Sequence, residues 1–282
     1  MLNINTNYAS AFASNAAKTA SKGLESAMEK LSSGSRINYA KDDAAGQAIS
    51  TRLSAEIQGL EMASRNAADA QSLLDTAEGA LQETSSVLLR MRELAVQSAN
   101  GTLTDTDRGH LDAEFQQLIE EVDRIAGNTT FAGQELLDGT YSSVSFQVGT
   151  GAGEVITVSI AGASSSDIGT TTGAAAVADL NSAVINTAAD ADAAIASVDK
   201  ALEEISTARG SLGAVSNRLG STMSNLDQIA VNLTSSQGRI ADADFAQETG
   251  NLAKNQILQQ AATAMIAQAN ASKSTILTLV RG

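Results

Sequence analysis

Charged side chains that could do chemistry gather in the stretch RINYAKDDAAGQAIS, residues 36–50. Neighbouring carboxylates beside a cation can act as an acid–base pair, but they can also cap a helix and complement its dipole. No histidine or cysteine accompanies Arg36, Asp42 and Asp43 in this stretch. A catalytic site would therefore lack a nucleophile and a metal ligand, and we interpret the cluster as a joint at the start of a long helix.

A second cluster of the same kind stands near the other end of the chain. The stretch GRIADADFAQETG, residues 238–250, contains Arg239, Asp242 and Asp244 between two helical patterns. If the long helices beside the two clusters run antiparallel, the clusters meet, and an arginine of one can face an aspartate of the other. We therefore expect a pair of helix-capping joints.

Three further candidate sites have simpler explanations. His110 is the only histidine, and it lacks the second histidine of a zinc-binding helix. GTGAG at 149–153 lies between two expected strands, so a hairpin turn explains it better than a phosphate loop. Asp190 and Asp192 lack the glycine and distal glutamate of a calcium loop, and a solvated helix start is the better interpretation. We expect no catalytic residue, no cofactor and no metal.

Composition limits the elements that can position these residues. Only 3% of the 282 residues are aromatic, and Pro, Cys and Trp are absent. A chain without proline can form long unbroken helices, and a chain without cysteine has no disulfide or thiolate chemistry. The start of the chain lacks a signal-peptide pattern, and no stretch is apolar enough for a membrane span. Neither a cleaved signal nor a membrane partner is expected.

Net charge excludes another class of partner. The formal net charge is −14, whereas binding to phosphate backbones needs a basic surface, so we expect no nucleic acid. Residues 1–34 and 245–282 are nearly neutral, and the acidic excess lies between them. The low charge of both ends is typical of surfaces that are buried in an assembly. The acidic charge of the middle is typical of surface that stays exposed to solvent.

Apolar residues recur every seven positions in two long segments. One row runs from Leu53 to Ala95, and another runs from Val198 to Leu233. A heptad repeat of this length predicts long helices that pack side by side as a coiled coil. Thr104 and Asp107 form the capping box of a shorter helix between them, which ends near Gly127.

The middle of the chain breaks the helical pattern. SSVSFQVGTGAGEVITVSI, residues 142–160, alternates apolar and polar residues around a glycine-rich turn and predicts a β-hairpin. Because it follows the outgoing long helix and precedes the returning one, we expect it at the outer tip. The predicted fold class is mainly α, a long antiparallel coiled-coil rod formed by the N- and C-terminal segments. Three parts are expected. Residues 1–42 and 241–282 form a terminal helical coiled-coil domain, and residues 43–140 and 186–240 form a helical rod domain. Residues 141–185 form a hairpin and loop region.

Several long motifs resemble bacterial flagellin. They are MEKLSSGSRINYAKDDAAGQAISTR (28–52), MRELAVQSANGT (91–102), RIADADFAQET (239–249) and LQQAATAMIAQAN (258–270). The resemblance covers about the first 140 and the last 95 residues. It implies a structural subunit, not an enzyme, that is exported unfolded by the flagellar type III apparatus, is secreted and extracellular, and self-assembles into the filament used for swimming. The alternatives are a hook–filament junction protein, which MRELAVQSAN disfavours, and an unrelated coiled-coil scaffold.

The resemblance also implies partners and contact residues. The partners are the protein itself, the filament cap and hook-associated proteins, an export chaperone and a Toll-like receptor of animals. The receptor-contacting residues of the family fall on Arg90, Leu94 and Glu114. The chain ends would line the filament core and be disordered in the monomer, because their sparse apolar stripes cannot bury themselves alone. The expected core-packing residues are Leu24, Met28, Leu31, Leu258, Met265 and Leu277.

Overall fold

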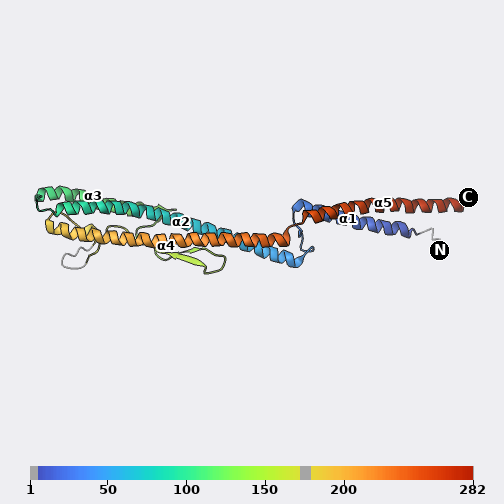
Figure 1. The fold of residues 1–282 in the computed structure, drawn as a ribbon, viewed down its shortest axis with the longest axis horizontal. Helices are drawn as coiled ribbons and strands as arrows, with labels where there is room; N and C mark the ends of the chain where they lie inside the picture. Colours follow the sequence, from blue (N-terminus) through green and yellow to red (C-terminus); the bar gives the residue numbers. More distant parts are fainter. Residues whose placement is uncertain (1–5, 172–178, 282) are drawn as a thin grey trace. The chain divides into compact units, whose positions relative to one another are not determined.

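The computed structural model describes residues 6–171 and 179–281, with side chains as far as residue 273. The chain divides into two compact units, which are residues 1–57 with 231–282 (unit 1) and residues 58–230 (unit 2). The predicted mainly α fold class is confirmed (Figure 1). The elements are α1 (Tyr8–Ser33), α2 (Ala44–Ser98), α3 (Asp105–Asn128), β1 (Thr130–Phe131), β2 (Gln134–Glu135), β3 (Val144–Gln147), β4 (Val155–Val158), the short 3-10 helix η1 (Leu180–Ser182), α4 (Ala188–Ala241) and α5 (Phe245–Arg281).

In unit 2 the two long helices run antiparallel along the predicted heptad seams. Arg92 pairs with Asp199 at 2.6 Å, and Arg209 lies 3.6 Å from Glu78. A later residue of α2 thus contacts an earlier residue of α4, as in an antiparallel pair. The heptad residues along this seam are buried because each faces the partner helix. They include Ala67, Leu74, Leu81, Leu88 and Ala95 of α2 and Val198, Ile205, Leu212 and Leu219 of α4.

Helix α3 packs along α2 as a third helix of unit 2 (Figure 1). The predicted capping box is confirmed, because Thr104 accepts from the backbone N–H of Asp107 and the Asp107 carboxylate accepts from Thr104. Those hydrogen bonds from the Thr104 side chain and backbone lower the pKa of Asp107 below its ordinary value of 3.8. Phe115 and Val122 of α3 are fully buried, so the apolar face of α3 joins the core of unit 2.

The predicted β-hairpin forms, but its expected position at the outer tip is wrong. β3 and β4 are antiparallel, with Phe146 opposite Ile156. Asn66 of α2 donates to the Gln147 carbonyl at 3.1 Å, about 50 Å of helix below the end of α2 at 1.5 Å per residue. The reason is α3, whose 24 residues carry the chain back along α2 before the hairpin begins. The hairpin then packs Ile156 and Val158 against the helices.

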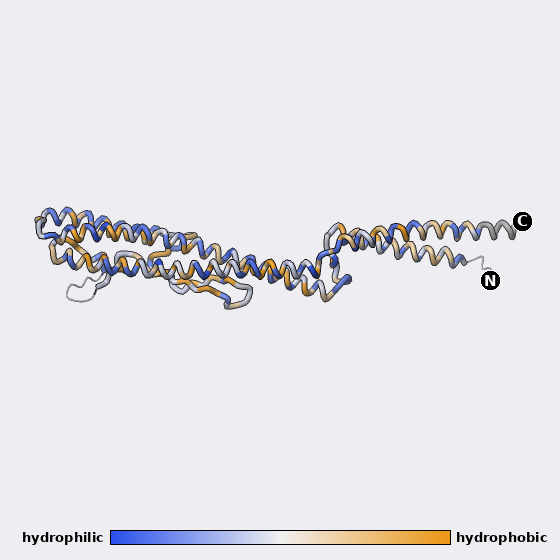
Figure 2. Tube along the Cα trace, viewed as in Figure 1, coloured by the Kyte–Doolittle hydropathy of each residue, from blue (hydrophilic) through white to orange (hydrophobic). Residues whose placement is uncertain are grey.

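In unit 1, α1 and α5 pack antiparallel on each other (Figure 1). Their contact is made by small residues, since Ala13, Ala20 and Ala27 of α1 recur every seven positions and are buried. Lys30 lies 3.6 Å from Glu248 across this seam. Figure 2 shows that this pair consists mainly of weakly polar to apolar residues, whereas strongly hydrophilic positions are frequent along α2 and α3.

Candidate functional site

The two predicted joints meet through their backbones in unit 1. Ser35 and Asp242 form an antiparallel β-bridge. The Arg36 N–H donates to the Ala241 carbonyl at 2.7 Å, and the Ala243 N–H donates to the Gly34 carbonyl at 2.9 Å. Segments about 200 residues apart in sequence are therefore tied together, as the sequence predicted.

The expected pairing of arginine with aspartate across the joint is wrong. Arg36 donates from Nε and Nη2 to the Ile240 carbonyl at 3.2 and 2.7 Å, and its ion pair at 3.6 Å is with Asp43 of its own segment. Arg239 instead donates to the hydroxyls of Ser235 and Ser236 on its own helix. The last carbonyls of α4 have no intrahelical donor, so they compete successfully for Arg36.

Two of the four aspartates cap helices. Asp43 accepts from the Gly46 N–H at 2.9 Å at the start of α2. Asp244 accepts from the N–H groups of Ala246 and Gln247 at the start of α5. Each carboxylate satisfies donors that the first helical turn leaves free.

The other two aspartates do not cap helices, contrary to the sequence-based expectation. Asp42 accepts from the N–H groups of Asn38 and Tyr39 and so closes the turn before α2. Asp242 lies in the β-bridge. Tyr39 was not predicted to take part, yet its pKa is raised above 10.0 chiefly by a hydrogen bond to Glu29, and the Lys41 ammonium lies 4.6 Å from its ring.

Of the residues expected to pack in a filament core, those with described side chains are not fully buried by the α1–α5 contact. Leu24 and Leu31 are half-buried, whereas Met28, Leu258 and Met265 are exposed. Leu277 lies outside the side chains that the structure describes. The alanine seam thus leaves the larger apolar side chains available on the outer faces of both helices, together with Tyr8 and Phe12, which are 71% and 79% exposed.

The expected receptor patch is only partly assembled. Arg90 of α2 donates to Glu114 of α3 at 2.8 Å and also pairs with Glu93. The Glu114 hydrogen bond, followed by that of Glu93, raises the pKa of Arg90. Leu94, however, is 1% exposed, so its predicted place on this surface is wrong. Leu94 belongs to the hydrophobic core that α2 shares with α3 and α4, while Leu89 remains exposed beside the pair.

The remaining candidates have structural explanations. His110 is exposed on α3. Gly151 lies in the hairpin turn, where its N–H donates to the Glu154 carboxylate at 2.9 Å. Asp190 exchanges hydrogen bonds with Thr187 at the start of α4. Within residues 6–171 and 179–281, no helix is long and apolar enough to span a bilayer.

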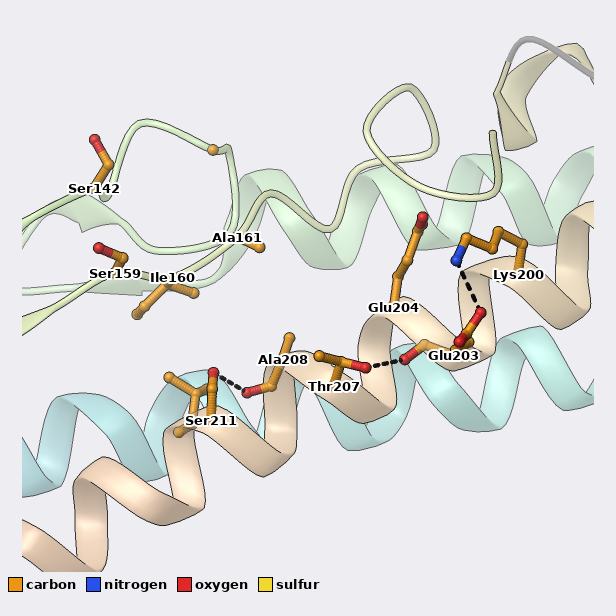
Figure 3. Close-up of a pocket in the computed structure, with 12 residues that line it drawn as sticks. Ser142, Ser159, Ile160, Ala161, Lys200, Glu203, Glu204, Thr207, Ala208 and Ser211 are labelled. Atoms are coloured by element: carbon orange, nitrogen blue, oxygen red, sulfur yellow. Dashed lines mark hydrogen bonds and ion pairs between the residues drawn. The ribbon is translucent and has the colours of Figure 1, made fainter. Parts of the chain in front are cut away.

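A cleft of about 630 Å³ lies between α4 and the segment that follows β4 (Figure 3). Its charged residues are engaged locally, since Lys200 pairs with Glu203 at 2.8 Å and Glu204 accepts from the Gly169 N–H. Among its hydroxyls, those of Thr207 and Ser211 donate to carbonyls of α4 itself, and that of Ser159 accepts from the Ser143 N–H. The cleft therefore presents no converging groups for a reaction.

Comparison with known proteins agrees with the resemblance of the chain ends. Residues 4–142 match the bacterial flagellin N-terminal helical region, and residues 195–280 match the C-terminal helical region. Flagellin of Halalkalibacterium halodurans is 46% identical over 91% of this chain and 92% of its own length. Flagellin of Bacillus subtilis is 40% identical over 99% of this chain and 100% of its own.

A solved structure shares the fold. It is of a protein assigned as flagellar hook-associated from Vibrio parahaemolyticus, with 18% identity and a TM-score of 0.59 over 71% of this chain and 100% of that one. At that identity only the fold is shared, and the flagellin relatives decide between filament subunit and junction protein. The chain belongs to the flagellin family and is a structural subunit of the bacterial flagellar filament, not an enzyme.

Proposed function

We propose that unit 1 is the part of the subunit through which copies associate, with α1 and α5 in the filament core. The observation that supports this is the division of the two helices into an alanine seam and an outer apolar surface. Phe12, Ile257 and Met265 are 79%, 66% and 62% exposed. Apolar side chains gathered on the surface of a subunit are typical of association surfaces.

The subunit leaves the cell unfolded through the flagellar type III apparatus and refolds outside. The absence of Cys and Pro supports this route, because refolding then needs neither disulfide exchange nor proline isomerisation. An export chaperone, the filament cap and the hook-associated proteins are the expected partners, since the chain ends carry the motifs of the family.

Charge substitutions on the outer face test the role of unit 1. The double variant Phe12→Asp and Ile257→Asp keeps the alanine seam, so its secondary structure by circular dichroism should match the parent. It should form no filaments, because a carboxylate in an apolar contact costs several kcal/mol. Val155→Asp, which alters an exposed apolar residue of unit 2, is the matched control and should polymerise normally. Filament growth by the double variant at the parental critical concentration, seen by electron microscopy, would overturn the proposal.

A second role, recognition by a Toll-like receptor of animals, is supported by the Arg90–Glu114 pair. The pair joins a basic and an acidic group of two helices on one exposed surface. Replacing Arg90 with Ala should weaken binding of the monomer to the receptor ectodomain by about 1–3 kcal/mol, as for arginine hot spots. Arg92→Ala is the control, because Arg92 pairs with Asp199 of α4. Equal affinities of the parent and the Arg90→Ala variant in a titration would exclude this contact.

A further inference from the structure

The exposed turn between α2 and α3 contains the only asparagine of the chain that is followed by glycine. Gly101 has no Cβ, so its backbone nitrogen can approach the side-chain carbon of Asn100 without a steric barrier. Apart from the two neighbouring residues, a Cβ at Gly101 would meet no heavy atom of another residue within 4 Å. The local surroundings therefore leave room for the two groups to react.

Hydrogen bonding in the turn favours such a reaction. The Asn100 Oδ1 accepts from the Thr102 N–H at 3.2 Å, and a donor on a carbonyl oxygen stabilises the oxyanion that forms when a nucleophile adds. In the part of the chain that the structure describes, no hydrogen bond engages the Gly101 N–H. The electrophile is thus polarised while the nucleophile is free.

A buried cation lies on the other carbonyl of Asn100. Arg108 is 5% exposed, and it donates to the backbone carbonyls of Ser98 at 2.6 Å and of Asn100 at 3.0 Å. Buried charges usually have a partner of opposite charge, yet among the described residues Arg108 has only these carbonyl oxygens. A carboxylate formed at the Asn100 carbonyl would complete an ion pair.

We propose that Asn100–Gly101 is a self-modifying site that rearranges to an isoaspartyl linkage, with Arg108 holding the new carboxylate. The Gly101 nitrogen, having lost its proton to solvent, attacks Asn100 Cγ, and the side-chain nitrogen leaves as ammonia. Water then adds to the Asn100 backbone carbonyl carbon and breaks its bond to the Gly101 nitrogen. The main chain now runs through Cβ and Cγ, and the former backbone carbonyl is a free carboxylate.

Arg108 determines which of two products forms. Hydrolysis at Cγ gives ordinary aspartate, whereas hydrolysis at the backbone carbonyl gives the isoaspartyl linkage. Arg108 polarises the backbone carbonyl oxygen and is already at hydrogen-bond distance from the oxygen that becomes a carboxylate oxygen. The isoaspartyl product therefore dominates in the folded chain.

Peptide mapping of the purified full-length chain tests the site. The chain is held in mildly alkaline buffer and digested at intervals, and isoaspartate is identified by electron-transfer fragmentation and by labelling with an isoaspartyl methyltransferase. Conversion at Asn100 should be at least an order of magnitude faster than at Asn128, an exposed asparagine followed by threonine. Gly101→Ala should slow it to the rate of Asn128 with unchanged circular dichroism, because the added methyl group has open space.

The role of Arg108 is tested by the product ratio. The isoaspartyl fraction should be higher in the folded chain than in the same chain unfolded in urea, and Arg108→Gln should lower it to the unfolded value. If Arg108→Gln does not fold, the isoaspartyl fractions of the folded and the urea-unfolded parent chain decide the role of Arg108. Equal fractions with and without the fold would overturn the role of Arg108. Conversion of Asn100 no faster than that of Asn128, or unaffected by Gly101→Ala, would overturn the site itself.

Discussion

Asp42 and Asp43 are identical neighbours with different tasks. Asp43 caps α2 through the Gly46 N–H, while Asp42 closes the preceding turn through Asn38 and Tyr39. The sequence identifies a capping cluster because carboxylates favour helix starts. It does not identify the cap itself, since either residue could precede the first helical turn.

Single substitutions should separate these two tasks. Asp43→Ala should destabilise the start of α2 by about 1 kcal/mol, because it removes an N-cap acceptor. Asp43→Asn keeps an acceptor oxygen and should lose much less. The measurement is the temperature at which filaments of each variant depolymerise. An equal loss for both substitutions would mean that the ion pair with Arg36, and not the cap, carries the effect.

At the scale of elements, the heptad rows predicted both long helices and their antiparallel packing. They did not predict that α2 buries a wider stripe than a two-helix coiled coil. Leu94 and Ala95 are both buried, because α2 packs against α3 as well as α4, and the short helix was expected beside Leu94 but not over it. The sequence contains the capping box and apolar face of α3, but nothing local states which helix that face contacts. Leu94 was therefore expected at the surface and the hairpin at the tip, because the sequence does not show how much of α2 the helix α3 covers or how far it carries the chain back.

The α1–α5 pair contains a contact that favours one register of the two helices, which the sequence did not reveal. An ideal Cβ on Gly23 would lie 2.7 Å from Asn255 Nδ2 and 2.9 Å from its Cγ. The glycine therefore makes room for a polar side chain of the opposite helix. Since the buried residues of the seam are alanines, which fit many registers, this pair and the Lys30–Glu248 ion pair favour one alignment.

A double-mutant cycle tests this alignment. Alanine in place of a mid-helix glycine normally stabilises by about 0.5–1 kcal/mol. Gly23→Ala alone should give no such gain, because Asn255 must move aside, whereas Gly23→Ala with Asn255→Ala should recover it. The coupling should be about 1 kcal/mol, within the range for residues in contact, when measured by thermal depolymerisation. A full gain in stability from Gly23→Ala alone would contradict the proposed role of the Gly23–Asn255 contact in fixing the register.

At the scale of the whole molecule, the two units differ in how they bury apolar surface. Among the residues that the structure describes, the buried members of the hydrophobic core of unit 2 lie between Ala67 and Leu219. It includes large side chains such as Phe115, Leu136 and Leu180, each of which is fully buried. The contact between α1 and α5 buries mainly alanines, and helices with so little buried area are marginal on their own. Unit 2 should therefore fold without α1 and α5, whereas these helices should need neighbouring subunits.

Removal of residues 245–282 should consequently separate folding from assembly. The truncated chain keeps every residue of the unit 2 core, so it should be soluble and helical, with one cooperative thermal transition. It should not polymerise, and hydrogen exchange should show α1 unprotected, because its partner α5 is missing. In the full-length monomer both helices should exchange nearly as fast, and both should become protected in filaments. Filaments grown from the truncated chain, or strong protection of α1 in it, would refute this division between a self-sufficient unit 2 and an assembly-dependent helix pair.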